Sequence, residues 1–187
     1  MKMIVRCQPY KSEIYHNGDN NEMSNKRIKS NNEISELCLF LLGGYQQNVL
    51  IEGRGKDNPI VITLHGGPGT PIPFSVGCRG LFPVFTDEFI MVYWDQLGCG
   101  INNYVVDDSF SIDTFVQMTA ELVEKIKLKF PNNKIMIFSN SWGSILSAKL
   151  LERNPYIVDS VIACGQIVKN VFICDEVRDT LAQTSIP

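Results

Sequence analysis

Short apolar segments alternate with helix-like segments in the second half of the chain, and this alternation constrains the fold more than any other feature. The buried strand KIMIFSN (134–140) precedes the helical segment SWGSILSAKLLERN (141–154), and a further strand, VDSVIACG (158–165), follows it. Strands that are apolar throughout and alternate with helices form parallel sheets with helices on both faces, joined by right-handed crossovers. We therefore expect an α/β fold with a mostly parallel sheet.

The remaining segments fit around such a sheet. Residues 36–53 contain two extended runs separated by Gly43 and Gly44, which predicts an antiparallel hairpin at a sheet edge. Apolar residues between 111 and 130 recur close to every 3.6 positions, so we expect an amphipathic helix there. Residues 168–183 are a candidate final helix.

The chain has 187 residues, which is enough for one ordinary domain. Residues 1–35 are rich in Asn and charge and poor in large apolar side chains, so we expect a polar N-terminal arm that is mobile or loosely docked. Residues 36–187 are then the α/β domain.

Composition excludes several classes of function. The net charge is −3 and the basic residues are scattered, which disfavours nucleic acid and membrane surfaces as partners. The sequence has no signal-peptide pattern and no apolar run of about 18 residues, so a cytoplasmic location is expected. Six cysteines without a CxxC pair disfavour zinc, and we expect no cofactor. Cys38 and Cys164 lie in apolar runs and are predicted to be reduced and buried.

The segment FSNSWGS (138–144) carries the strongest chemical signal. A buried strand runs into a tight turn and directly into a helix, with Ser141 at the apex, as in a nucleophile elbow. Such a turn requires small residues two positions before and after the serine, and Ser139 and Gly143 are small. The alternative is a plain strand-to-helix turn without chemistry.

The segment HGGPG (65–69) also follows a strand, Ile60–Leu64. The N–H groups of Gly66 or Gly67, together with that of Trp142, could stabilise the oxyanion of an acyl-transfer intermediate. The alternative is that the glycines only turn the loop. We expect His65 to brace this loop by hydrogen bonding rather than to act as a base.

A third loop, WDQLGCG (94–100), follows the strand in EFIMVYW (88–94). Asp95 has the residue type of a triad acid, but it precedes the serine, whereas in this arrangement the acid follows it. A structural role for Asp95 in loop hydrogen bonding is therefore favoured.

Together the three motifs resemble the α/β-hydrolases of the proline iminopeptidase (prolyl aminopeptidase) type, whose members carry HGGPG, DQRGxG and GxSWG in this order. The resemblance covers about residues 36–165. It implies a serine hydrolase of the peptidase, amidase or esterase class, with Ser141 as nucleophile and a short peptide, aminoacyl amide or ester as substrate. Two departures concern substrate preference: Leu97 stands where the family usually has Arg, and Cys99 replaces a small polar residue.

The sequence has no histidine at the place expected for the third member of a catalytic triad. The order expected for the fold is serine, acid, histidine, yet the two histidines, His16 and His65, both precede Ser141. The resemblance implies that this sequence is the N-terminal part of a larger hydrolase, ending at the start of the helical cap and lacking the C-terminal strands. We expect it to be nearly inactive alone and to associate through an uncovered sheet edge. A noncatalytic binding or scaffold protein and one half of a split hydrolase remain the alternatives.

Overall fold

A computed structural model describes residues 6–9, 33–71, 84–106 and 109–168. These residues form a seven-stranded sheet with the strand order β1-β2-β3-β5-β4-β6-β7. Neighbouring strands from β5 to β7 run parallel, while β1, β2, β3 and β5 are successively antiparallel. The elements in chain order are β1 (Arg6–Pro9), β2 (Ile34–Leu42), β3 (Tyr45–Gly53), β4 (Ile60–Leu64), α2 (Phe85–Glu88), β5 (Ile90–Tyr93), α3 (Ile112–Lys129), β6 (Ile135–Asn140), α4 (Trp142–Arg153) and β7 (Ser160–Cys164).

The predicted hairpin is confirmed. Strands β2 and β3 pair from Ile34↔Gly53 to Leu42↔Tyr45, and the turn between them consists of Gly43 and Gly44, with φ of 57° and 84°. Two successive positive φ values explain why glycine occupies both positions. The hairpin does not end the sheet, however, because β1 pairs with β2. Part of the segment expected to be a polar arm is therefore a strand.

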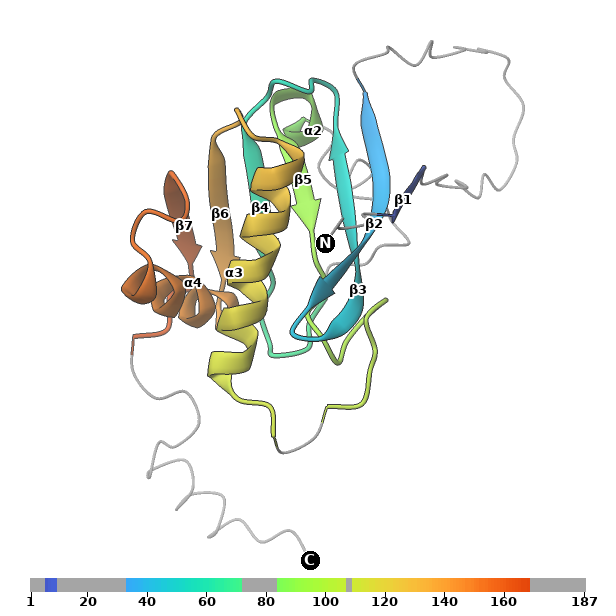
Figure 1. Cartoon of the computed structure of the whole chain (residues 1–187). Helices are drawn as coiled ribbons and strands as arrows, with labels where there is room; N and C mark the ends of the chain where they lie inside the picture. The colour runs from blue at the N-terminus through green and yellow to red at the C-terminus, as the bar shows by residue number, and fades with distance from the viewer. Residues whose placement is uncertain (1–5, 10–32, 72–83, 107–108, 169–187) are drawn as a thin grey trace, which may run out of the picture.

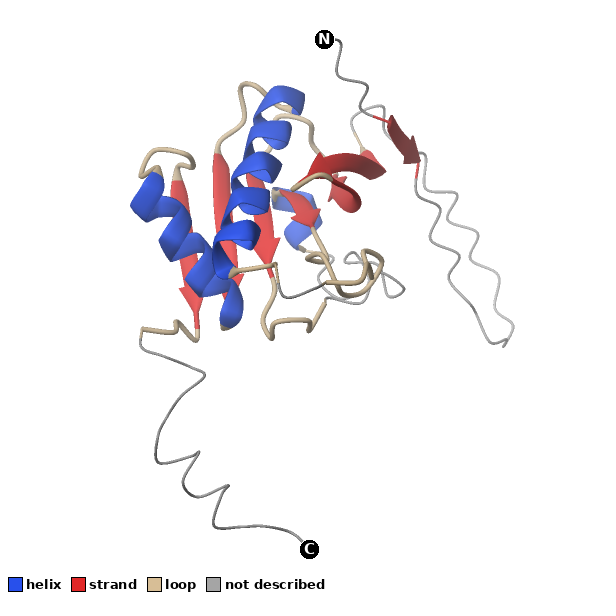
Figure 2. Cartoon of the chain, turned by 60° about the horizontal axis from the view of Figure 1, so that its bottom comes forward, coloured by secondary structure: helices blue, strands red, loops and turns tan. Residues whose placement is uncertain are grey.

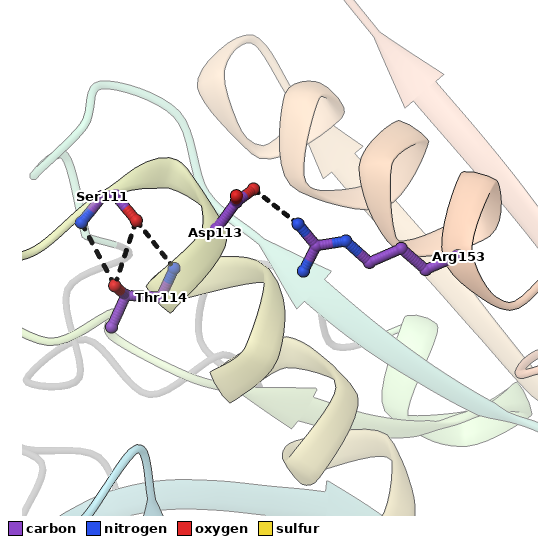
Figure 3. Close-up of polar contacts among 4 residues, drawn as sticks. All are labelled: Ser111, Asp113, Thr114 and Arg153. Carbon is purple, nitrogen blue, oxygen red and sulfur yellow. Dashed lines mark hydrogen bonds and ion pairs between the residues drawn. The ribbon is translucent and has the colours of Figure 1, made fainter.

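Helix α3 begins and ends within one residue of the predicted limits. Ser111 is its N-cap: the Ser111 side chain accepts a hydrogen bond from the amide of Thr114, and the Thr114 hydroxyl accepts one from the amide of Ser111 (Figure 3). This reciprocal capping box satisfies amides that a helix start leaves unpaired. Asp113 of the first turn forms an ion pair with Arg153 at the end of α4, which ties the two helices together on their solvent side (Figure 3).

The main core lies between the sheet and these two helices. Buried side chains of α3 and α4, such as Leu122 and Leu146, pack in one cluster with Ile62 and Ile137 of the central strands, so both helices cover the same face (Figures 1 and 2). The opposite face carries a smaller buried cluster, consisting of Leu50, Met91 and Tyr93. The predicted α/β architecture is thus present as a mixed sheet with its long helices packed against it.

Strand β7 ends the sheet and is largely exposed. Ile162 of β7 lies in register with Phe138 of β6, and these two large apolar side chains are 53% and 38% exposed. The prediction that Cys164 is buried is wrong: its thiol is exposed, whereas the Cys38 thiol is fully buried. The difference arises because Cys38 lies on an interior strand under α3, while β7 has only one neighbouring strand among the described residues. The candidate helix at 168–183 lies outside the described residues, apart from its first position.

Candidate active site

Ser141 occupies the turn between β6 and α4. Its backbone has φ 49° and ψ −114°, and it is the one non-glycine residue with positive φ in the described part of the chain. A side chain in this region is strained, and surrounding contacts must hold it there. One such contact is the hydrogen bond from the Ser141 amide to the Cys164 carbonyl, at 2.9 Å. The side chain is half-buried, and its Oγ has no hydrogen-bond partner among the described residues.

Close backbone contacts around the turn require small residues. A Cβ added to Gly143 would lie 2.3 Å from the Leu64 carbonyl oxygen, and one added to Gly66 would lie 3.3 Å from the Cβ of Ser141. Helix α4 therefore contacts the end of β4, and the loop formed by residues 65–69, called the glycine loop below, contacts Ser141. Ser139, which replaces the usual glycine, is fully buried, and its hydroxyl bonds to that of Ser147 at 2.9 Å. This hydrogen bond explains how the turn accommodates a hydroxymethyl group at position 139.

The glycine loop follows β4 and folds back on itself. The amide of Thr70 donates to the Gly66 carbonyl at 3.3 Å, and Gly67 has a φ of 113° that only glycine adopts readily. No acceptor among the described residues takes the amides of Gly66 and Gly67. Within the described residues these two N–H groups therefore have no acceptor, and Gly66 lies against Ser141.

His65 is buried and bonded through both ring nitrogens. Its Nδ1 lies 2.9 Å from the Gly66 carbonyl, and its Nε2 accepts the amide of Gln96 at 2.9 Å, an arrangement that requires the proton to be on Nδ1. Burial lowers the pKa of His65 from its ordinary value, which keeps the ring neutral. The ring therefore links two loops and has no nitrogen left for Ser141.

Gln96 was not singled out by the sequence, although it lies within one of the three motifs. Its side-chain amide donates to the His65 carbonyl at 3.2 Å and accepts a hydrogen bond from the indole N–H of Trp142 at 2.9 Å. Trp142 is the residue after Ser141, so Gln96 joins the glycine loop to the start of α4. A sequence pattern contains no signal for these partners, which lie 31 and 46 positions away.

Asp95 is buried within its own loop. Its carboxylate accepts the amide of Ile101 at 3.0 Å, and its carbonyl accepts the side chain of Asn102 at 2.7 Å. A Cβ on Gly100 would overlap the carboxylate, so glycine is required there. Burial raises the pKa of Asp95 from 3.8 to about 6. No described hydrogen bond joins it to His65 or Ser141.

The two departures from the motif pattern are both buried in this loop. Leu97 packs into the main hydrophobic core and is 4% exposed. The Cys99 thiol donates to the Gln96 carbonyl at 3.0 Å and lies 3.5 Å from Nε2 of His65. Burial, and secondarily the charge of Asp95, raises the pKa of Cys99 to about 11, so the sulfur is a neutral thiol.

Three features are typical of α/β-hydrolases. They are the sheet order, the strained serine between β6 and α4, and the glycine loop beside it. Residues 59–184 match the model of the alpha/beta hydrolase fold family, and the chain belongs to this family. The Probable aminopeptidase YbaC of Bacillus subtilis is 30% identical over 130 residues, which are 68% of this chain and 40% of that protein. The Proline iminopeptidase of Neisseria gonorrhoeae is 33% identical over 124 residues, covering 66% of this chain and 36% of the relative. The resemblance inferred from the motifs is therefore confirmed.

Solved structures show the same fold at lower identity. A proline iminopeptidase-related protein from Thermus thermophilus superposes with a TM-score of 0.53 at 23% identity, covering 70% of this chain and 44% of that one. The BphD hydrolase of Rhodococcus sp. strain RHA1 gives 0.56 at 23% identity, covering 75% and 49%. The chain thus spans less than half the length of the relatives and structures compared here. None of the described helices has the length and apolar character needed to cross a membrane.

Proposed function

We propose that the chain carries the nucleophile of a serine hydrolase, and that Ser141 is this nucleophile. The observation that carries the proposal is the strained backbone of Ser141 at the β6–α4 turn, with a half-buried Oγ that has no hydrogen-bond partner among the described residues. Strained residues persist only where the surrounding structure holds them, and they cluster at active sites. In this turn, the strain would present the hydroxyl at the carboxyl edge of the sheet, where the glycine loop also lies.

In the proposed reaction, the Ser141 Oγ attacks the carbonyl carbon of an amide or ester and forms a new C–O bond. The carbonyl oxygen becomes an oxyanion, held by the N–H of Trp142 and of Gly66 or Gly67. The C–N or C–O bond to the leaving group then breaks, and the leaving group takes the proton that Ser141 released. Water hydrolyses the acyl-enzyme in a second step of the same kind.

The group that accepts the Ser141 proton is proposed to be a histidine outside these 187 residues. Both ring nitrogens of His65 are already bonded, and the sequence contains no histidine after Ser141. A serine hydroxyl without a base is a poor nucleophile. The 187-residue chain by itself is therefore expected to be nearly inactive.

The proposed substrates are short peptides with a free N-terminus, or aminoacyl amides and esters. The support is the similarity to proteins named proline iminopeptidase and probable aminopeptidase. A preference for proline, and a cytoplasmic location, stay predictions.

The test compares Ser141→Ala with Ser160→Ala in the polypeptide as its own gene encodes it. Ser160 is an exposed serine at the first position of β7, and it pairs with Met136 at the end of β6 that lies away from Ser141. Hydrolysis of aminoacyl p-nitrophenyl esters and p-nitroanilides should fall at least about 1,000-fold in the Ser141 variant and persist in the Ser160 variant. Unchanged hydrolysis after Ser141→Ala would overturn the assignment, and a lack of hydrolysis in the unaltered polypeptide would favour a noncatalytic binding protein.

We further propose that the 187-residue chain associates through β7. This strand has a single neighbour among the described residues, and Ile162 and Phe138 form an apolar strip beside its free edge. An unpaired strand edge is a template for pairing with another chain. Sedimentation of the isolated chain should show association that Ile162→Lys weakens. A monodisperse monomer at all concentrations would contradict this proposal, whereas co-purification with a separate polypeptide would support a split hydrolase.

A further inference from the structure

Gln96 connects the two segments that supply the proposed oxyanion donors. Its backbone amide donates to Nε2 of His65, and its side-chain amide donates to the carbonyl of the same residue. The side-chain oxygen of Gln96 accepts the indole N–H of Trp142. Two hydrogen bonds therefore fix Gln96 to the residue before Gly66, and one fixes it to the residue after Ser141.

The chemistry of this position matches glutamine in particular. A carbonyl on one side requires a donor, and an indole N–H on the other requires an acceptor; a primary amide offers both in one plane. The partners also determine which end of the amide is oxygen and which is nitrogen. Gln96 is 2% exposed, so water does not replace either hydrogen bond if the side chain is lost.

The Trp142 indole is fixed on another side as well. The Phe115 ring of α3 meets it edge-on, with the ring centroids 6.2 Å apart. The side chain is 5% exposed and belongs to the main core cluster. With its ring held by Gln96 and Phe115, Trp142 has little freedom to rotate, and its backbone amide at the start of α4 is held with it.

We propose that Gln96 is a positioning residue that sets the spacing between the two halves of the oxyanion site, the amides after His65 and the amide of Trp142. The inference rests on the proposed acyl-transfer function of Ser141. Oxyanion donors act only when they lie within hydrogen-bond distance of the oxygen as charge develops on it. A displacement of about 1 Å is enough to reduce a rate about 100-fold.

The molecule contains a matched control for this role. Gln47 is fully buried, accepts the indole N–H of Trp94 at 2.9 Å and donates to the Leu42 carbonyl at 3.0 Å. The two glutamines thus make the same pair of hydrogen bonds, one to an indole and one to a carbonyl. Gln47 joins β3 to the end of β2 and to Trp94, and none of these partners belongs to the glycine loop or the Ser141 turn.

The experiment compares Gln96→Met with Gln47→Met in the polypeptide as its own gene encodes it. Methionine approximates the length of glutamine and removes both hydrogen bonds. For an aminoacyl p-nitrophenyl ester, Gln96→Met should lower kcat about 10- to 100-fold and change KM by less than about threefold. It should also lower the ratio of ester to thionoester turnover, because sulfur accepts hydrogen bonds poorly and depends less on well-placed amides. Gln47→Met should leave kcat and this ratio near the wild-type values.

A second variant keeps the test valid if Gln96→Met fails to fold. The carboxyl group of Gln96→Glu, when protonated, donates to the His65 carbonyl and accepts from Trp142 as the amide does; when ionised, it cannot donate. Its kcat relative to wild type should therefore rise as pH falls through the pKa of the new carboxyl group, whereas Gln47→Glu should show no such recovery of kcat.

The outcomes separate this inference from the proposed function. If Ser141→Ala retains hydrolysis, the nucleophile assignment and the role of Gln96 both fail. If Ser141→Ala is inactive but the Gln96 variants keep the wild-type kcat and ester-to-thionoester ratio, the inference about Gln96 alone is overturned. It is also overturned if Gln47→Met lowers kcat and the ratio as much as Gln96→Met does, because a general loss of stability then explains both.

Discussion

The β6–α4 turn and the β7 edge lie on adjacent strands of one sheet, yet they are packed in opposite ways. At the turn, Gly143 leaves no room for a methyl group against Leu64, and Gly66 touches Ser141. At the edge, Ile162 keeps more than half of its surface exposed. Contacts among the described residues therefore fix the conformation of the turn. Among the same residues, β7 has no neighbouring strand on its outer side. This contrast predicts where substitutions will have large effects and where they will have almost none.

The largest effect is expected from Gly143→Ala. In an exposed helix, alanine is about 1 kcal/mol more favourable than glycine. Here the new Cβ would lie 2.3 Å from the Leu64 carbonyl oxygen, so we expect the free energy of unfolding to fall by about 3 kcal/mol. Gly44→Ala is the control, because its Cβ meets no atom within 4 Å and only its φ of +84° is unfavourable. Urea denaturation of both variants measures the difference, and a stabilised Gly143→Ala would show that the close contact does not exist.

An intermediate effect is expected from Asp95. Its raised pKa means that the folded protein holds this proton more tightly than the unfolded chain does. The contribution of Asp95 to stability therefore falls as pH rises from about 4 to about 6, by at most about 3 kcal/mol, and the loss persists at neutral pH. Asp95→Asn retains an acceptor for the Ile101 amide and should stabilise the protein at about pH 7 while having little effect near pH 4. Thermal unfolding at the two pH values tests this, and destabilisation at neutral pH would contradict it.

The smallest effect on stability is expected at the β7 edge. Ile162→Thr keeps a β-branched side chain on an exposed strand position, so the free energy of unfolding should change by less than about 0.5 kcal/mol. The matched substitution Ile137→Thr, on the fully buried side of β6, should cost at least about 2 kcal/mol. If the two variants lost the same free energy of unfolding, Ile162 would have to be buried to the same extent as Ile137, which would contradict this prediction.

Much of the fold could be predicted from sequence because its signals are local. The apolar run Ile60–Leu64 is the strand β4, the glycine pair at 43 and 44 is the hairpin turn, and the spacing of apolar residues between 111 and 130 gives α3. Strand β1 was not anticipated, because its pairing partner β2 lies about 30 residues away and the segment between them is polar. The exposure of Cys164 was missed for a related reason: an apolar run shows that a strand exists but not how many neighbours it has.

The residues of the candidate site also fall into those that a local sequence pattern reveals and those that it does not. The turn at Ser141 and the glycine loop could be located because strand, small residue and helix follow one another in sequence. Gln96 could not be found in this manner, since its hydrogen bonds to His65 and Trp142 depend on how three separate loops meet. The presence of serine rather than glycine at position 139 likewise depends on the hydrogen bond to Ser147, which lies in α4 directly after the turn.

The central claim, that Ser141 is a nucleophile, is tested most directly by chemical trapping. The polypeptide as its own gene encodes it would be treated with an alkyl fluorophosphonate, which phosphonylates activated serines with loss of fluoride, and its peptides analysed by mass spectrometry. The account predicts one phosphonyl group, on Ser141, and none after Ser141→Ala. Absence of the adduct, or its presence on another residue with Ser141 unmodified, would contradict the account.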